Sequence, residues 1–313
     1  MRRRTRSLLV VAAAAVLGWV GGAGQAAAEY PVDYNFFGGI GPELTNPGGS
    51  LPGSNDFGCV PSAAHPNPVV LLHGTGGAAQ TNWGVYAPLL ANEGYCVFAL
   101  TYGAYPLPWP ITAIGGMRPI EQSAAEVAAF VDRVLASTGA ERVDFVAHSQ
   151  GNIVGNYYIK RLGGAQKVDR FAAIAPPWLG TNAAGAGDIA AFSRALGAGP
   201  AFDAVATSLC QACGQMLTGS PFMTALNADG VYAPSVTYTN VVTVLDELVV
   251  PYTSGLVPGP NATAHVVQDG CAQDYSEHMA IAGSPRAAGY VLNALDPARG
   301  APVPCEFVPP FTG

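Results

Sequence analysis

Short apolar segments that alternate with amphipathic segments constrain the fold of this 313-residue chain more than any other feature. Strand-like segments lie at residues 68–72, 95–101, 142–147, 168–174, 236–245 and 263–267. Segments with the apolar spacing of helices lie at residues 82–93, 120–135, 153–162 and 287–295. Strands that alternate with helices form parallel sheets with helices on both faces. The sequence therefore predicts an α/β fold.

The N-terminus has the composition of a secretory signal peptide. Four arginines precede an apolar run at residues 8–20, and alanines at 26–28 provide a cleavage site. The alternative is a membrane anchor, but a membrane-spanning helix needs roughly 20 apolar residues. We therefore expect residues 1–28 to be a signal peptide and the mature protein to be secreted and extracellular.

Charge and composition limit the partners and the domain organisation of the mature chain. Loss of the four arginines changes the net charge from −7 to −11, which argues against a nucleic-acid partner. No linker, repeat or charge block divides residues 29–313, so we expect one domain. Residues 29–64 lack periodicity and indicate an extended segment. Residues 178–232, rich in Ala and Gly, indicate a cap inserted into the sheet.

Six cysteines, an even number, predict disulfide bonds in an exported chain. The spacing alone does not decide how they pair. Cys210 and Cys213 form a C-x-x-C motif, which is also compatible with a redox pair or half of a zinc site. There is no second C-x-x-C, and this one does not open a helix after a strand. A local disulfide is the favoured interpretation.

The turn at residues 147–151, Ala-His-Ser-Gln-Gly, lies between a predicted strand and a predicted helix. That context is typical of a nucleophile elbow, a tight turn that exposes a serine. Small residues are needed two positions before and after the serine, and Ala147 and Gly151 meet this need, although Ala147 replaces the usual glycine. A chance turn is the alternative, but the flanking elements argue against it. We predict that Ser149 is a nucleophile.

Two backbone N–H groups are candidates to stabilise an oxyanion. The N–H of Gln150 lies at the start of the predicted helix after the serine. The second donor normally comes from a loop after an earlier strand, and residues 73–77, His-Gly-Thr-Gly-Gly, occupy that position. We assign the second donor to the N–H of Thr75, with its hydroxyl as a further donor. The alternative for this loop is an ordinary turn at a strand end.

A nucleophilic serine needs a base, and the chain has five histidines. His65 precedes the first strand, His73 opens the glycine loop and His265 lies within a predicted strand. His148 is adjacent to the serine, and its side chain is expected to point away from the reacting centre. His278 lies between the last strand and the last helix, where the order Ser, Asp or Glu, His places the base. We predict that His278 is the base.

An acidic residue should orient the base from the end of the next-to-last strand. Asp246 occupies that position, with Glu247 as the next candidate. Asp269 is weaker because it follows the wrong strand. A simple turn role for Asp246 is the alternative, since Asp is common in turns.

With these residues in place, the chain resembles the secreted actinobacterial class-2 triacylglycerol lipases of the α/β-hydrolase superfamily. The matching segments lie at residues 68–75, 82–83, 94–100, 119–124, 147–151, 219–222, 246–252 and 276–278. The likeness extends from about residue 30 to residue 305. It is specific because the segments occur in family order, including some with no catalytic role.

The resemblance implies an α/β-hydrolase fold, with a mostly parallel sheet, helices on both faces and a cap. It implies hydrolysis of carboxylic esters such as acylglycerols, by Ser149, Asp246 and His278, without a cofactor or metal ion. The expected partners are an ester or lipid substrate and, transiently, a lipid interface; the protein is expected to be a monomer. An extracellular acyltransferase with the same triad, or a non-catalytic binding protein, are the alternatives.

The resemblance also suggests how the cysteines pair. The implied disulfides are Cys59–Cys96, Cys210–Cys213 and Cys271–Cys305. The chain departs from the family pattern at two places. Gly76 and Gly77 replace a bulkier residue found in many members, and Asn152 stands where a second glycine is common. These departures affect expectations about substrate preference rather than mechanism.

Overall fold

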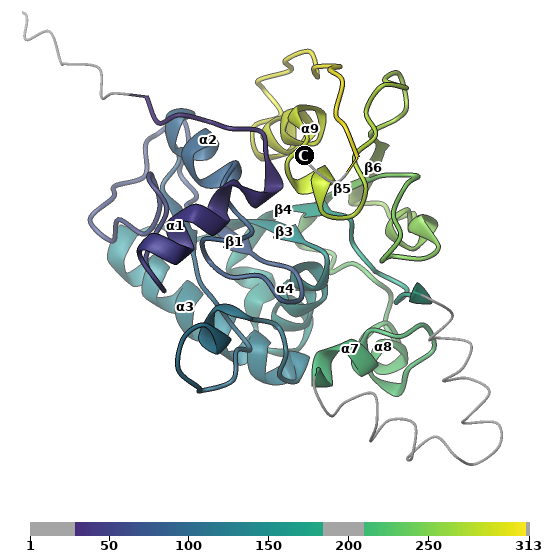
Figure 1. Cartoon of the computed structure of the whole chain (residues 1–313). Coiled ribbons are helices and arrows are strands. Elements are labelled where there is room, and N and C mark those ends of the chain that lie inside the picture. Colours follow the sequence, from purple (N-terminus) through teal and green to yellow (C-terminus); the bar gives the residue numbers. More distant parts are fainter. Residues whose placement is uncertain (1–28, 184–209, 311–313) are drawn as a thin grey trace, which may run out of the picture.

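A six-stranded, entirely parallel sheet forms the centre of the protein (Figure 1). The computed structural model describes residues 29–183 and 210–310. The strand order is β2-β1-β3-β4-β5-β6. The strands are β1 (Val69–Leu72), β2 (Val97–Ala99), β3 (Val143–His148), β4 (Val168–Ile174), β5 (Thr237–Val242) and β6 (Ala262–Val266). The predicted α/β fold with a parallel sheet is confirmed.

Helices cover both faces of this sheet. Helices α3 (Ile120–Thr138) and α4 (Gln150–Arg161) pack on one face, and α2 (Tyr86–Asn92) and α9 (Pro285–Leu295) pack on the other (Figure 1). Successive residues of β1 alternate between the two hydrophobic clusters that result. A strand buried on both faces favours apolar side chains at successive positions, which explains the continuous apolar runs of β1 and β2.

Two helix boundaries differ from the sequence prediction because loop contacts take precedence over periodicity. The helix expected at 82–93 begins only at Tyr86, since Asn82 bonds to the glycine loop instead. The helix expected at 153–162 begins at Gln150, immediately after the serine. A nucleophile elbow requires this direct passage from strand to helix.

The N-terminal segment is more structured than expected. It contains the short 3₁₀ helix η1 (Phe36–Gly39) and helix α1 (Ile40–Thr45), which lie near the carboxyl end of β1 (Figure 1). Glu43 holds this segment in place, because its carboxylate accepts a hydrogen bond from the Gln80 side chain (2.7 Å). The predicted signal peptide lies outside the described residues.

The predicted cap is described only at its two ends, residues 178–183 and 210–232. The second part contains the short helices α7 (Gln211–Gln215) and α8 (Pro221–Leu226). Among residues 29–183 and 210–310, the other short 3₁₀ helices are η2 (Ile111–Ala113), η3 (Gly164–Gln166), η5 (Tyr252–Gly255) and η6 (Ala280–Ala282). Within the described part of the chain, no helix combines the length and apolar character needed to cross a membrane.

All six cysteines are paired, as Cys59–Cys96, Cys210–Cys213 and Cys271–Cys305. The first bond ties the N-terminal segment to the start of β2, and the third ties the C-terminal segment to the loop that follows β6. These are the pairings that the family resemblance implied.

Candidate active site

Ser149 occupies a strained turn between β3 and α4. Its φ angle is +53°, a conformation that side chains with a Cβ rarely adopt. Gly151 makes the turn possible, because a Cβ at this position would lie 2.1 Å from the carbonyl oxygen of Leu72. The predicted elbow is therefore present, with the serine at the carboxyl end of the central strand.

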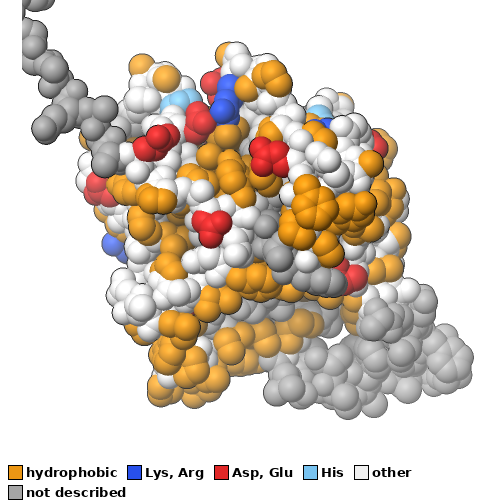
Figure 2. Space-filling view, turned by 45° about the horizontal axis from the view of Figure 1, so that its top comes forward, with side chains coloured by type: hydrophobic (Ala, Val, Ile, Leu, Met, Phe, Trp, Pro, Cys, Tyr) orange, Lys and Arg blue, Asp and Glu red, His pale blue; other side chains and the backbone are white. Residues whose placement is uncertain are grey.

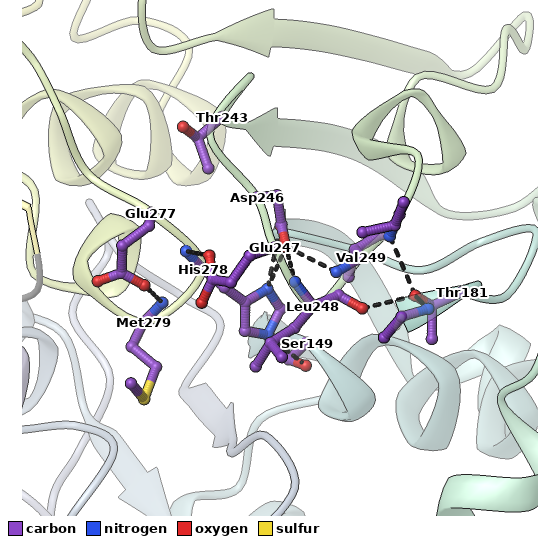
Figure 3. Close-up of polar contacts among 12 residues, drawn as sticks. Ser149, Thr181, Thr243, Asp246, Glu247, Leu248, Val249, Glu277, His278 and Met279 are labelled. Carbon is purple, nitrogen blue, oxygen red and sulfur yellow. Dashed lines mark hydrogen bonds and ion pairs between the residues drawn. The ribbon is translucent and has the colours of Figure 1, made fainter. Parts of the chain in front are cut away.

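The structure brings Ser149, His278 and Asp246 together in a hydrogen-bonded series (Figure 3). The Nε2 atom of His278 lies 2.8 Å from Ser149 Oγ, and its Nδ1 atom lies 2.9 and 3.0 Å from the two carboxylate oxygens of Asp246. The side chains of His278 and Asp246 are 4% and 2% exposed. Water therefore competes little for these contacts.

The carboxylate of Asp246 is fixed by its own loop. Its Oδ1 atom accepts hydrogen bonds from the N–H groups of Leu248 (3.0 Å) and Val249 (2.6 Å). Thr181, at the start of the predicted cap, clamps the same loop, because its hydroxyl donates to the Leu248 carbonyl (2.5 Å) and accepts from the Val250 N–H (3.0 Å). Asp246 thus faces His278 in one orientation.

A cluster of buried polar side chains fixes the loop that carries His278. Asp274 accepts hydrogen bonds from the hydroxyls of Ser276 (2.5 Å) and Ser284 (2.7 Å). Thr243, just after β5, donates to the Ser276 carbonyl (2.6 Å). Glu247, the second candidate acid, does not contact the imidazole; its carboxylate accepts the backbone N–H of His278 (3.2 Å). Asp269 has no such contact with His278.

Thr75, in the glycine loop, and Gln150, at the start of α4, lie on two segments that meet beside Ser149. Gln150 is the first residue of α4, and the first N–H groups of a helix lack intrahelical partners. The Gln150 side chain donates to Thr75 Oγ1 (3.1 Å) and to the Gly116 carbonyl (2.9 Å), which links the two loops. Gly74 approaches closely, since a Cβ there would lie 3.1 Å from Ser149 Cβ. The glycine loop and the start of α4 therefore lie together beside Ser149.

The other histidines lie where the sequence indicated, with one exception. The His65 ring packs at a tilt against Tyr95, and His265, in β6, stacks on Tyr290 of α9, both away from Ser149. His73 is buried under the glycine loop, and burial lowers its pKa to about 4. His148 was expected to point away from the centre, but it lies beside His278, with ring centroids 5.1 Å apart. The close packing of the base loop over β3 causes this difference.

Ser149 opens into a cavity of about 580 Å³ with a mostly apolar lining. Sequence reasoning missed the part of this lining that comes from the N-terminal segment, which has no periodic pattern. The lining side chains beyond the glycine loop include Phe36, Phe37, Ile40, Met216, Leu217, Leu248, Val249 and Met279. On the face shown in Figure 2, charged side chains are sparse and hydrophobic side chains cover much of the surface. The site can hold an apolar group next to the serine.

Comparison with known proteins assigns the family. A sequence model of the family described as lipase (class 2) matches residues 66–289. Aspergillus fumigatus lipase B is similar in structure, with a TM-score of 0.58, 18% identity and coverage of 80% of this chain and 57% of the fungal one. A Bacillus licheniformis lipase in its mature form gives a TM-score of 0.55, 16% identity and coverage of 80% and 99%.

The chain thus spans little more than half of the fungal lipase but almost all of the mature bacterial one. At these identities the structural likeness supports the α/β-hydrolase fold alone. The family match covers most of the chain and includes the elbow, the glycine loop and the loops that hold Asp246 and His278. The chain belongs to the class 2 lipase family and is a carboxylic ester hydrolase.

Proposed function

We propose that this protein hydrolyses lipid esters such as acylglycerols, with Ser149 as nucleophile, His278 as general base and acid, and Asp246 as the group that orients His278. The observation that carries this proposal is the hydrogen-bonded series from Asp246 through His278 to Ser149, which opens into an apolar cavity. Ser149 also has the strained backbone of an exposed nucleophile.

The proposed reaction proceeds through an acyl-enzyme. Ser149 Oγ attacks the ester carbonyl carbon while His278 Nε2 takes the hydroxyl proton. The N–H groups of Thr75 and Gln150 donate to the negatively charged oxygen of the tetrahedral intermediate. His278 then gives its proton to the leaving alcohol, and a water molecule, activated by His278, releases the acid and regenerates Ser149. Asp246 stabilises the imidazolium in both halves.

Substitution of the nucleophile tests this proposal. Ser149→Ala should lower kcat by several powers of ten, with folding unchanged, because the residual rate comes only from substrate binding and the oxyanion donors. The measurement is initial-rate kinetics on p-nitrophenyl butyrate, with melting temperature as a folding control. A folded Ser149→Ala protein with a rate within about tenfold of the parent contradicts the proposal.

We also propose that the protein is exported, in keeping with its resemblance to the secreted actinobacterial members of the family. The support is the signal-like composition of residues 1–28 together with three disulfides, which persist in oxidising compartments. Mass spectrometry of the protein from a secreting culture should find an N-terminus at Glu29. An intact N-terminus on a cell-associated protein contradicts this.

We further propose that the protein contacts a lipid interface transiently through the loop at residues 104–117. This loop contains no charged residue, and its side chains Leu107, Trp109, Ile111 and Ile114 are 39–52% exposed. Its last part lies beside the glycine loop, where Gly115 exchanges backbone hydrogen bonds with residues 76 and 77. Exposed apolar patches of this kind mark interaction surfaces.

Vesicle binding tests the interface proposal. Leu107→Asp should weaken co-sedimentation with phosphatidylcholine vesicles and leave hydrolysis of dissolved p-nitrophenyl acetate unchanged, because Leu107 is 52% exposed and does not line the cavity at Ser149. Val60→Asp is the matched control, because Val60 is also exposed but lies on the opposite, amino-terminal side of the sheet. Equal binding by the parent and the Leu107 variant contradicts the proposal.

A further inference from the structure

Two buried polar side chains, Asn82 and His148, connect the glycine loop to the loop that carries His278. Asn82 Oδ1 accepts the backbone N–H of Gly74 (3.0 Å), the residue before Thr75. His148 Nδ1 lies 3.2 Å from the same oxygen, and His148 Nε2 lies 2.9 Å from the carbonyl oxygen of His278. Asn82 and His148 are each 3% exposed. No step of the hydrolysis uses either side chain directly.

The two partners of His148 are both hydrogen-bond acceptors, which fixes its tautomer. A neutral imidazole has one N–H and can satisfy only one of the two oxygens. Burial lowers the pKa of His148 to about 3, so the ring is neutral at neutral pH. The shorter contact, to the His278 carbonyl, identifies Nε2 as the protonated nitrogen. His148 then holds the backbone of His278 in place through this hydrogen bond.

The remaining nitrogen of His148 leaves Asn82 with two possible amide orientations. A reversed amide would donate to His148 Nδ1 but would turn its NH₂ group toward the Gly74 N–H. In the observed orientation Asn82 Oδ1 accepts from Gly74, and Asn82 Nδ2 is buried with no partner among the described residues. A buried donor without a partner costs about 1–3 kcal/mol. The Asn82 amide therefore keeps its hydrogen bond with the Gly74 N–H and forgoes a hydrogen bond from its NH₂ group to His148 Nδ1.

We propose that Asn82 is a positioning residue for the oxyanion donor of Thr75, and that His148 holds the base loop through its Nε2–H, which donates to the His278 carbonyl. The inference rests on the proposed function of Ser149, Thr75 and His278. Asn82 anchors the backbone N–H of Gly74, the residue before Thr75, at a point so close to Ser149 that a Cβ on residue 74 would crowd it. Oxyanion donors act only at the distance that the transition state requires. Loss of the anchor should thus affect kcat and not substrate binding.

The experiment compares Asn82→Ala with Asn156→Ala. Asn156 is an equally buried amide that bonds to the Val231 carbonyl (2.8 Å) and the Tyr238 hydroxyl (3.0 Å), away from the serine. On p-nitrophenyl butyrate, Asn82→Ala should lower kcat by about 10- to 100-fold and change KM by less than about threefold. Its affinity for phenylboronic acid, which forms a tetrahedral adduct with serine, should fall by a similar factor. Asn156→Ala should lower only the melting temperature.

A kcat for Asn82→Ala within about threefold of the parent, or a loss confined to KM, overturns the inference. Amide hydrogen exchange at Gly74, followed by NMR, reports on the hydrogen bond between Asn82 and Gly74 and does not depend on catalysis. It therefore distinguishes failure of this inference from failure of the proposed function. Gly74 should exchange faster in Asn82→Ala than in the parent. If Asn82→Ala does not fold, Asn82→Asp, which keeps an acceptor oxygen, should retain slow exchange at Gly74. Fast exchange in that variant also overturns the inference.

Discussion

The orientation of Asp246 leads to a quantitative prediction for Asp246→Asn. Two N–H groups, from Leu248 and Val249, point at Oδ1 of Asp246, so an asparagine will place its amide oxygen there. Its NH₂ group then occupies the position of Oδ2, 3.0 Å from His278 Nδ1. An N–H donor at this position competes with Oδ1, which lies 2.9 Å from the same nitrogen, and it stabilises the tautomer whose proton is on Nε2, where it faces Ser149 Oγ. In that tautomer His278 cannot accept the serine proton.

The expected loss follows from the wrong tautomer. The corresponding substitution in a serine protease lowers kcat about 10⁴-fold, equivalent to about 5.5 kcal/mol. We expect a loss of this order in kcat on p-nitrophenyl butyrate, with KM within about threefold because the acid does not contact substrate. The control is Glu247→Gln, which retains an acceptor for the His278 N–H and should keep kcat within about tenfold of the parent.

The opposite ranking would refute this reasoning. A folded Asp246→Asn protein with kcat within about tenfold of the parent would mean that Asp246 does not determine the tautomer of His278. A larger loss in Glu247→Gln than in Asp246→Asn would transfer the acid role to Glu247. Melting temperatures of both variants establish whether either result comes from unfolding.

Three further predictions concern stability and substrate range. Burial raises the pKa of Asp144 to about 7. Between about pH 4 and pH 7 the native state therefore binds more protons than the unfolded state. Because of this difference, the free energy of unfolding falls as pH rises through that range, by at most about 4 kcal/mol. Asp144→Asn should remove this fall in urea denaturation at pH 4.5 and 8, and an unchanged pH dependence would contradict it. Replacement of Cys59 and Cys96 by serine opens a loop with a sequence separation of 37 and should lower the unfolding free energy by about 4 kcal/mol; a loss below about 1 kcal/mol contradicts this. The apolar cavity predicts that kcat/KM on p-nitrophenyl esters rises from acetate to butyrate or hexanoate, whereas a steady fall from acetate would exclude an acyl-binding role for the cavity.

The sheet was predictable because burial on both faces leaves a direct mark on the sequence. The apolar run at 68–72 contains β1, and the strand-like segment at 168–174, apolar from Phe171 onward, coincides with β4. The positions of Ser149 and His278 were predictable because an elbow lies at a strand end and because chain order restricts the base. Each of these predictions depends on local pattern or on element order, both of which one sequence contains.

Contacts between loops are not encoded in this way. Asn82 seemed to begin a helix because Trp83 and Tyr86 have helical spacing, but its side chain bonds to Gly74, eight residues earlier. The orientation of His148 depends on the His278 loop, 130 residues away in the chain. Phe36 lies in an aperiodic segment, and only long-range packing places it at the cavity. The signal that could have identified Asn82 is a polar side chain that follows the glycine loop closely in the sequence.

The most direct test of the central claim is covalent labelling with a fluorophosphonate, which reacts with serine nucleophiles activated by a base. We predict a single adduct per molecule, mapped to Ser149 by peptide mass spectrometry, with loss of ester hydrolysis in proportion to labelling. Ser149→Ala should take up no label, and His278→Ala should react far more slowly. An adduct on another residue, or hydrolysis that continues after Ser149 is fully labelled, would contradict the account.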